Sequence, residues 1–189
     1  MYIFDIETLG IESKSVILSM ACIYFNPEEK PTYEQLLESA FFVKLDAKDQ
    51  VRRLNRDISK STLEWWEKQP EEIKIMSLYP SDKDVIAETA LASFATWVNQ
   101  FPDYKTSTIW ARGNLDQICL GSLETELDRK PIFHFSRWRD VRTAVDLLTG
   151  SNNGYCAIPG LDESKVLKHN PIHDAAYDAM MLMYGSHAE

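Results

Sequence analysis

The sequence predicts an α/β fold in which one mixed, five-stranded sheet is flanked by helices. Three apolar, strand-like segments come first, and helical and strand-like segments alternate after them. The chain has 189 residues and is 44% hydrophobic, which is enough for one full core. It contains no internal repeats, low-complexity tracts or Gly/Ser linkers. We therefore expect residues 1–189 to form a single domain.

The first three strands are expected at residues 2–5, 16–25 and 40–45. The connections between them are short, which favours an antiparallel meander. The Asn26–Pro27 and Lys30–Pro31 steps provide breaker residues for a turn between the second and third strands.

The rest of the chain is expected to alternate between helices and two further strands. Ser61 and Glu64 have the spacing of a capping box at the start of a helix. The expected helices cover residues 61–69, 82–101, 115–127, 140–148 and 174–184, and the expected strands cover 106–111 and 132–135. Strands that follow helices in this way are expected to pair in parallel.

Composition limits the classes of function. A net charge of −9 argues against nucleic-acid binding by overall charge. The charge is uneven, however, because residues 44–60 contain six basic residues and only three acidic ones. The six are Lys44, Lys48, Arg52, Arg53, Arg56 and Lys60. This segment either contacts phosphate or is a solvated surface, and the sequence leaves both open.

Cysteine usage indicates a reducing compartment. Cys22, Cys119 and Cys156 are odd in number, far apart and outside any CxxC pair, which disfavours a disulfide framework or a zinc site. No segment is apolar for long enough to span a bilayer, and the N-terminus lacks a signal-peptide pattern. We expect a cytoplasmic protein with no membrane partner.

Two acidic residues on the first strand indicate a cation site. Asp5 and Glu7 are two residues apart, so their carboxylates leave the same face of an extended segment and repel each other unless a cation lies between them. Mg²⁺ and Mn²⁺ prefer such oxygen ligands. Taken alone, the pair is also compatible with an exposed edge strand that carries acids for solubility.

Asp116 is the third candidate ligand. It follows an expected strand and Gly113, at the start of an expected helix. An acid there is stabilised by the helix dipole, and the carboxyl end of a central strand is also where open α/β sheets place their sites. Both roles are compatible.

His173 and Asp178 complete the candidate set. They are five residues apart, which puts them on different faces of an ideal helix. We therefore expect His173 in the loop before the last helix and Asp178 within the helix, with Pro171 near the boundary. Asp174 then falls at the N-cap in a structural role, although its spacing from Asp178 leaves a role as ligand open.

These segments resemble the DEDDh-type 3′–5′ exonucleases, the superfamily of proofreading exonucleases and RNase T. The matching pieces are FDIET, GNLD and HDAAYD, together with STLEWWEKQ, WARG, RDVRT and IHDAAYDAMMLM. The last four of these pieces look closest to the T-even phage exodeoxyribonuclease and mycobacterial exoribonuclease groups. In those relatives more residues separate the glycine from the second aspartate than in Gly113–Asp116. The resemblance implies an RNase H-like fold and a bacterial or phage-infected bacterial host.

The resemblance also implies a mechanism. Two Mg²⁺ or Mn²⁺ ions would be bound, the first by Asp5, Glu7 and Asp178, with Asp5 bridging to the second and Asp116 holding the second. His173 would take a proton from the attacking water, since an imidazole titrates near neutrality. The product would be a nucleoside 5′-monophosphate released from the 3′ end.

Further residues are expected to bind substrate. The resemblance implies that Thr8, Leu9 and Gly10 meet the terminal nucleotide, with Leu9 against the base. Of Trp65 and Trp66, which point about 100° apart on a helix, we expect one to be buried and the other to stack on a base.

The remaining candidates divide between substrate and structural roles. Arg112 either contacts phosphate or forms an internal ion pair, and for Arg139, Asp140 and Arg142 an internal ion pair is expected. The other histidines, His134, His169 and His187, are expected to be surface or packing residues.

The expected function is thus metal-dependent 3′–5′ exonuclease activity on single-stranded DNA or RNA 3′ ends, with DNA slightly favoured. An exoribonuclease that trims RNA ends or short oligonucleotides is the first alternative. A non-catalytic nucleic-acid-binding accessory module is an alternative of another class. The oligomeric state stays open, a homodimer included.

Overall fold

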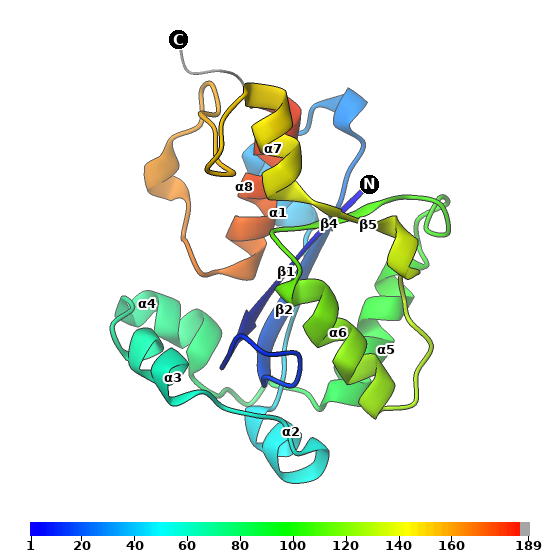
Figure 1. Cartoon of the computed structure of the whole chain (residues 1–189), viewed down its shortest axis with the longest axis vertical. Helices are drawn as coiled ribbons and strands as arrows, with labels where there is room; N and C mark the ends of the chain where they lie inside the picture. The colour runs from blue at the N-terminus through cyan, green and yellow to red at the C-terminus, as the bar shows by residue number, and fades with distance from the viewer. Residues whose placement is uncertain (186–189) are drawn as a thin grey trace.

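The structure, a computed structural model, describes residues 1–185, so the expected surface position of His187 lies outside the described residues. Within that range the chain forms one five-stranded sheet in the order β3-β2-β1-β4-β5 (Figure 1). The strands are β1 (Tyr2–Thr8), β2 (Ile17–Tyr24), β3 (Phe41–Lys44), β4 (Ile109–Ala111) and β5 (Trp138–Asp140). β1 to β3 pair antiparallel, and β4 and β5 continue the sheet in parallel. The predicted mixed sheet is confirmed.

Helices cover both faces of this sheet (Figure 1). They are α1 (Tyr33–Ser39), α2 (Ala47–Leu54), α3 (Lys60–Glu67), α4 (Glu71–Ile73), α5 (Ala87–Val98), α6 (Leu115–Glu126), α7 (Val141–Thr149) and α8 (Pro171–Tyr184). A π-helical turn at Lys74–Leu78 follows α4, and short 3-10 turns lie at Pro27–Glu29, Phe135–Arg137 and Glu163–Lys165. No helix of residues 1–185 is both long and apolar enough to cross a membrane.

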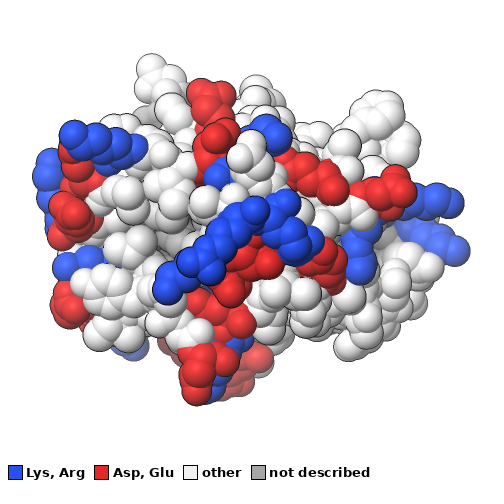
Figure 2. Space-filling view, turned by 90° about the horizontal axis from the view of Figure 1, so that it is seen from below, with Lys and Arg blue, Asp and Glu red and all other residues white. Residues whose placement is uncertain are grey.

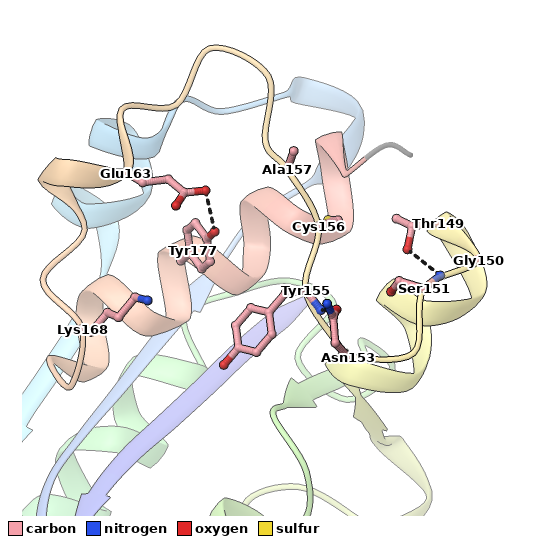
Figure 3. A pocket seen from close by; sticks show the side chains of 10 residues that line it. All are labelled: Thr149, Gly150, Ser151, Asn153, Tyr155, Cys156, Ala157, Glu163, Lys168 and Tyr177. Atoms are coloured by element: carbon pink, nitrogen blue, oxygen red, sulfur yellow. Dashed lines mark hydrogen bonds between the residues drawn. The ribbon is translucent and has the colours of Figure 1, made fainter. Parts of the chain in front are cut away.

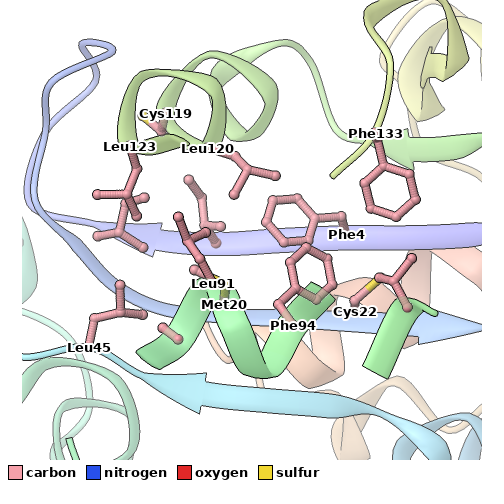
Figure 4. Packing of buried hydrophobic residues seen from close by; sticks show 14 of the residues in the cluster. Phe4, Met20, Cys22, Leu45, Leu91, Phe94, Cys119, Leu120, Leu123 and Phe133 are labelled. Carbon is pink, nitrogen blue, oxygen red and sulfur yellow. The ribbon is translucent and has the colours of Figure 1, made fainter. Parts of the chain in front are cut away.

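Alternation along β1 separates the two cores. Phe4 packs with residues of α5 and α6 such as Phe94 and Leu120, as Figure 4 shows. Ile3 faces the other way and packs with residues of α1, α7 and α8. Because successive strand residues point to opposite faces, Asp5 shares the α8 face with Ile3.

Several predicted boundaries are wrong. The meander is interrupted by α1, which begins at a capping box between Thr32 and Gln35 rather than following a simple turn. The cap of α3 is Ser59 and not Ser61, because the Ser59 hydroxyl accepts the Thr62 N–H. The fifth strand lies at Trp138–Asp140 instead of 132–135, where Phe133 packs in the core from a loop.

The basic segment 44–60 forms α2 and its flanks, and its charges are largely paired. Arg56 is buried and donates to Glu126 Oε2 at 2.8 Å. Arg53 donates to both Asp49 and Glu88. Figure 2, seen from the α2 side, shows Lys and Arg interspersed with Asp and Glu instead of a continuous positive face. The arrangement supports the solvated-surface interpretation.

Candidate active site

A cavity of about 360 Å³ lies at the carboxyl end of β1, where that strand approaches α6 and α8. We call it the acidic cavity. Five carboxylates from three distant parts of the chain line it: Asp5, Glu7, Asp116, Asp174 and Asp178. The structure thus brings together all four carboxylates expected from the sequence and adds Asp174.

The first two carboxylates come from β1. Asp5 and Glu7 lie opposite Ala21 and Ser19 of β2 in the antiparallel register. Their side chains leave the strand on the face that α8 covers, as the two-residue spacing predicts. β1 is the central strand of the sheet. It pairs with β4 at Tyr2 and Ile3, and at Asp5 and Glu7 it pairs with β2.

Asp116 reaches the same cavity in spite of the short connection from Gly113. It is 6% exposed, and its Oδ1 accepts the Ile6 N–H at 3.0 Å. Gly113 adopts φ +81°, a conformation that favours glycine, and its N–H donates to Asp140 Oδ1 at 2.8 Å. The tight turn is therefore fixed at both ends.

The predicted start of the last helix is wrong. α8 begins at Pro171, and Asn170 is its cap, with Oδ1 accepting the Ile172 N–H at 3.0 Å. His173 is therefore helical instead of lying in the preceding loop, and Asp174 lies in the first turn instead of at the N-cap. A proline at the first helical position is a favoured arrangement, which the sequence interpretation overlooked.

His173 points away from the acidic cavity. Its Nδ1 lies 2.8 Å from the Tyr33 hydroxyl of α1 and accepts the Leu167 N–H at 3.4 Å. The residues that line the cavity within the described chain do not include His173. In this structure its imidazole links α8 to α1.

His169, which was expected to be a surface or packing residue, lines the acidic cavity instead. His169, Glu7 and Asp174 each offer one donor atom, and these atoms all lie within 4.8 Å of one another. The backbone of His169 adopts φ +66°, which is uncommon for a residue other than glycine and is frequent at functional sites.

Three contacts hold His169 in that conformation. Its N–H donates to Asp174 Oδ2 at 2.8 Å, and its carbonyl accepts the Ser77 hydroxyl at 2.9 Å. Ser77 belongs to the π-helical turn, a form often found at functional sites. The Trp65 ring meets the imidazole edge to face, with centroids 4.7 Å apart.

The sequence contained a signal for this pair. His169 and Asp174 are five residues apart, the same spacing as His173 and Asp178. Two overlapping histidine–aspartate pairs therefore fit one pattern. With the helix start at Pro171, His169 lines the cavity and His173 does not, whereas Asp174 and Asp178 both line it.

Asp178 lines the cavity but is held by Arg112. Both Nε and Nη2 of Arg112 donate to Asp178 Oδ1, at 3.0 and 2.5 Å. Nη1 donates to the Gly154 carbonyl at 2.8 Å, and the guanidinium stacks on Tyr155 with 4.2 Å to the ring centroid. Of the two roles left open for Arg112, this geometry matches the internal ion pair.

Asp140 does not form the ion pair expected with Arg139 or Arg142. It caps α7 by accepting the Thr143 N–H at 2.9 Å, in addition to holding Gly113. Arg142 lines the acidic cavity. Asp140 therefore has a structural role, as expected, but it acts by hydrogen bonds to backbone N–H groups and not by an ion pair.

The expected substrate-binding residues differ in exposure. Trp66 is buried and its Nε1 donates to the Thr8 carbonyl, whereas Trp65 is 40% exposed beside His169. Thr8, Leu9 and Gly10 are all buried. Leu9 packs against Trp66 in a small third core, which does not support its expected contact with a base.

Burial and mutual repulsion perturb the carboxylates. Burial raises the pKa of Asp5 well above its ordinary value, and repulsion from Asp116 and Asp174 adds to the rise. Burial also raises the pKa of Asp116 and that of Asp174 to about 7. In contrast, burial lowers the pKa of His169, which favours the neutral imidazole. Such a concentration of carboxylates is stabilised when cations bind to it.

Comparison with known proteins finds similar sequences and a similar fold. An exodeoxyribonuclease of Enterobacteria phage T4 is 32% identical over 201 residues, which cover 97% of this chain and 87% of the relative. The solved nuclease domain of 3′hExo, a DEDDh family member bound to rAMP, has the same fold with a TM-score of 0.65. That likeness covers 96% of this chain and 90% of the other at 14% identity.

Residues 1–185 match the family described as the 3′–5′ exoribonuclease Rv2179c-like domain. The match covers the three segments that supply the acidic cavity, from β1 through α6 to α8. The chain therefore belongs to the family described as the 3′–5′ exoribonuclease Rv2179c-like domain.

Proposed function

We propose that this 3′–5′ exonuclease hydrolyses single-stranded nucleic acid in the acidic cavity and releases nucleoside 5′-monophosphates, with DNA as its preferred substrate. The observation that carries the proposal is the convergence of Asp5 and Glu7 with Asp116 and the His169–Asp174 pair in one cavity. The roles expected for His173 and Asp178 pass in this proposal to His169 and Asp174.

The donor set fits divalent cations. Carboxylate oxygens from Asp5, Glu7, Asp116 and Asp174 are the ligands that Mg²⁺ and Mn²⁺ prefer, and four of them suit a pair of ions better than one. When bound, two such ions would polarise the phosphate and lower the pKa of the attacking water. Asp178 is less suited as a ligand because Arg112 already neutralises it.

His169 would act as the general base. Its lowered pKa keeps the imidazole neutral and able to accept a proton from the attacking water near neutral pH. The water oxygen would form a bond to phosphorus while the bond from phosphorus to the 3′-oxygen breaks. That 3′-oxygen takes up a proton and leaves as the new 3′-hydroxyl of the shortened strand.

In this proposal Trp65 holds the terminal base. It is 40% exposed, and its ring meets that of His169, a residue that lines the cavity, with centroids 4.7 Å apart. Stacking on an aromatic ring is sequence-tolerant, which suits an exonuclease that removes any nucleotide. Trp66 instead fixes the end of β1 through Thr8.

The preference for DNA is supported by the exodeoxyribonuclease relative, which is similar over nearly the whole chain. A second candidate, exoribonuclease activity, is supported by the description of the family that matches residues 1–185. The two differ in whether the 2′-hydroxyl is accommodated.

A polymer assay tests both candidates. The protein is incubated with 5′-labelled single-stranded DNA or RNA in Mg²⁺, Mn²⁺ or EDTA. We expect a ladder that shortens from the 3′ end in either metal, faster on DNA, and no cleavage in EDTA. Faster shortening of RNA would replace the first candidate with the second. Cleavage in EDTA, or inside the strand, would overturn the metal-dependent exonuclease proposal.

A further inference from the structure

A second cavity adjoins the acidic cavity. We call it the side cavity. Its volume is about 640 Å³. Sites that bind small organic groups usually have volumes of roughly 300–1,000 Å³. Tyr155, Lys168 and Tyr177 line both cavities and form the boundary between them (Figure 3). A chain that leaves the acidic cavity across this boundary enters the side cavity directly.

Tyr155 is an exposed ring on a fixed support. It is 48% exposed, and the Arg112 guanidinium covers one face at 4.2 Å. The preceding carbonyl, from Gly154, accepts a hydrogen bond from the same guanidinium at 2.8 Å. The ring is thus positioned from one side, and its remaining exposed surface faces the cavities it lines.

The loop that carries Tyr155 is anchored to α7. Asp146 Oδ1 accepts both the Ser151 hydroxyl at 2.7 Å and the Gly154 N–H at 2.8 Å. Gly154 adopts φ +71°, and a Cβ there would lie 2.8 Å from Arg142 Cγ. The loop therefore passes close to Arg142, a residue that lines the acidic cavity.

The charges on the side cavity are divided. Lys168 lies on the boundary with the acidic cavity and is exposed. Glu163 lies on the wall and accepts the Tyr177 hydroxyl at 3.1 Å, as Figure 3 shows. A phosphate group is therefore favoured at the Lys168 end, and an uncharged base is favoured against Tyr155.

The position of the side cavity fits the direction of the substrate. Trp65, the proposed platform for the terminal base, belongs to α3, which lies below the end of β1 in Figure 1. The segment 150–163, which supplies most of the side cavity, lies above α3 and α4 (Figure 1). The geometry points to the side cavity as the binding site for the nucleotide on the 5′ side of the scissile phosphate, with its base on Tyr155 and Lys168 facing phosphate. This inference rests on the proposed exonuclease function.

Two substrates that share the terminal nucleotide test the inference. One is a dinucleotide, and the other is the p-nitrophenyl ester of the corresponding nucleoside 5′-monophosphate, which has no upstream nucleotide. Both are prepared with the sugar that the polymer assay favours. The variants are Tyr155→Ala and Tyr155→Phe, with Phe135→Ala as a control because Phe135 is 73% exposed and lines neither cavity.

The measured quantity is kcat/KM for the dinucleotide divided by kcat/KM for the ester. We expect Tyr155→Ala to lower this ratio about tenfold, the size of one lost base stack, chiefly through KM for the dinucleotide. Tyr155→Phe and Phe135→Ala should keep the wild-type ratio. An unchanged ratio in Tyr155→Ala, with both substrates hydrolysed, would overturn the inference and leave the exonuclease proposal standing. If the wild-type protein hydrolyses neither the dinucleotide nor the ester, both the inference and the exonuclease proposal would be overturned.

Discussion

His169 and His173 lie four residues apart in the sequence, but their side chains have different surroundings. His169 borders the carboxylates and is held by Asp174, Ser77 and Trp65. His173 is bonded to Tyr33 on the far side of α8. A residue held in an uncommon backbone conformation beside a cluster of carboxylates is the better candidate for proton transfer.

We expect His169→Ala to lower kcat about 10²–10⁴-fold, the usual contribution of a general base, while Mn²⁺ binding persists in calorimetry. His173→Ala should keep most of the activity and lower the melting temperature, because it removes the link to Tyr33. The two variants are matched in size and chemistry. Loss of activity in His173→Ala together with retention in His169→Ala would refute the assignment.

Glu124 on α6 provides a pH test away from the active site. It is 4% exposed, and burial raises its pKa to about 7. The folded protein therefore binds more protons at this site than the unfolded chain between the ordinary carboxyl pKa and about 7. The free energy of unfolding consequently falls as pH rises through that window.

In the wild type, Glu124 Oε1 accepts the Ile132 N–H at 2.7 Å. Glu124→Gln removes the negative charge and keeps an oxygen that can accept this hydrogen bond. At pH 8 we expect the variant to be more stable than the wild type by about 1–3 kcal/mol, with little difference at pH 4. Urea unfolding at the two pH values measures it. Destabilisation at both pH values would show that the carboxylate itself is required.

At the scale of elements, the first residue of a helix determines which side chains line the active site. The apolar patterns identified the last helix and the helix at α6, but the first residue of α8 was misplaced by three positions. Pro171 is compatible with either side of a helix boundary, since a proline both follows extended residues and favours the first helical turn. Because α8 begins at Pro171, His169 lines the acidic cavity and His173, the expected base, does not. The expected ligand Asp178 lines the cavity together with Asp174.

The turn from Gly113 to Asp116 depends on the cap of α7. Asp140 accepts the Thr143 N–H and also fixes Gly113, whose turn leads to Asp116. We expect Asp140→Ala to lower stability by about 0.5–2 kcal/mol, as loss of an N-cap usually does. Activity should fall as well, because the Asp116 turn loses its anchor.

Thermal unfolding and steady-state rates check the Asp140 prediction. Asp46→Ala is a suitable control, since Asp46 likewise caps a helix, α2, by accepting the Asp49 N–H at 3.0 Å, and it lines neither cavity. Equal polymer cleavage rates in wild type and Asp140→Ala would contradict the coupling between the cap of α7 and the turn from Gly113 to Asp116.

At the scale of the molecule, the sheet order explains why three distant segments meet. β1 is central, β4 runs parallel beside it, and α8 packs across β1 and β2. Residues in the second half of β1, after β4 and in the first turns of α8 therefore meet at the same end of the sheet. The mixed sheet and the carboxylates Asp5, Glu7 and Asp116 could be predicted because they depend on strand periodicity and on strand ends.

Other features depend on long-range contacts that no local pattern reports. The pairing of Arg112 with Asp178 joins residues 66 positions apart, and the burial of Leu9 depends on Trp66. The strand β5 has only three residues, too few for periodicity to place it. α2 was overlooked because its residues are predominantly polar, and its Arg53 pairs with Asp49 of the same helix and with Glu88 of α5.

The central claim is that cations bind among Asp5, Glu7 and Asp174, beside His169. Crystals soaked in Mn²⁺ and measured for anomalous scattering test it most directly. We expect at least one peak at coordination distance, roughly 2.0–2.3 Å, from carboxylate oxygens of these residues, and no such peak in an Asp5→Asn crystal. A peak coordinated by Asp178 with Arg112 displaced and His173 turned inward would contradict it, as would the absence of bound manganese from the acidic cavity.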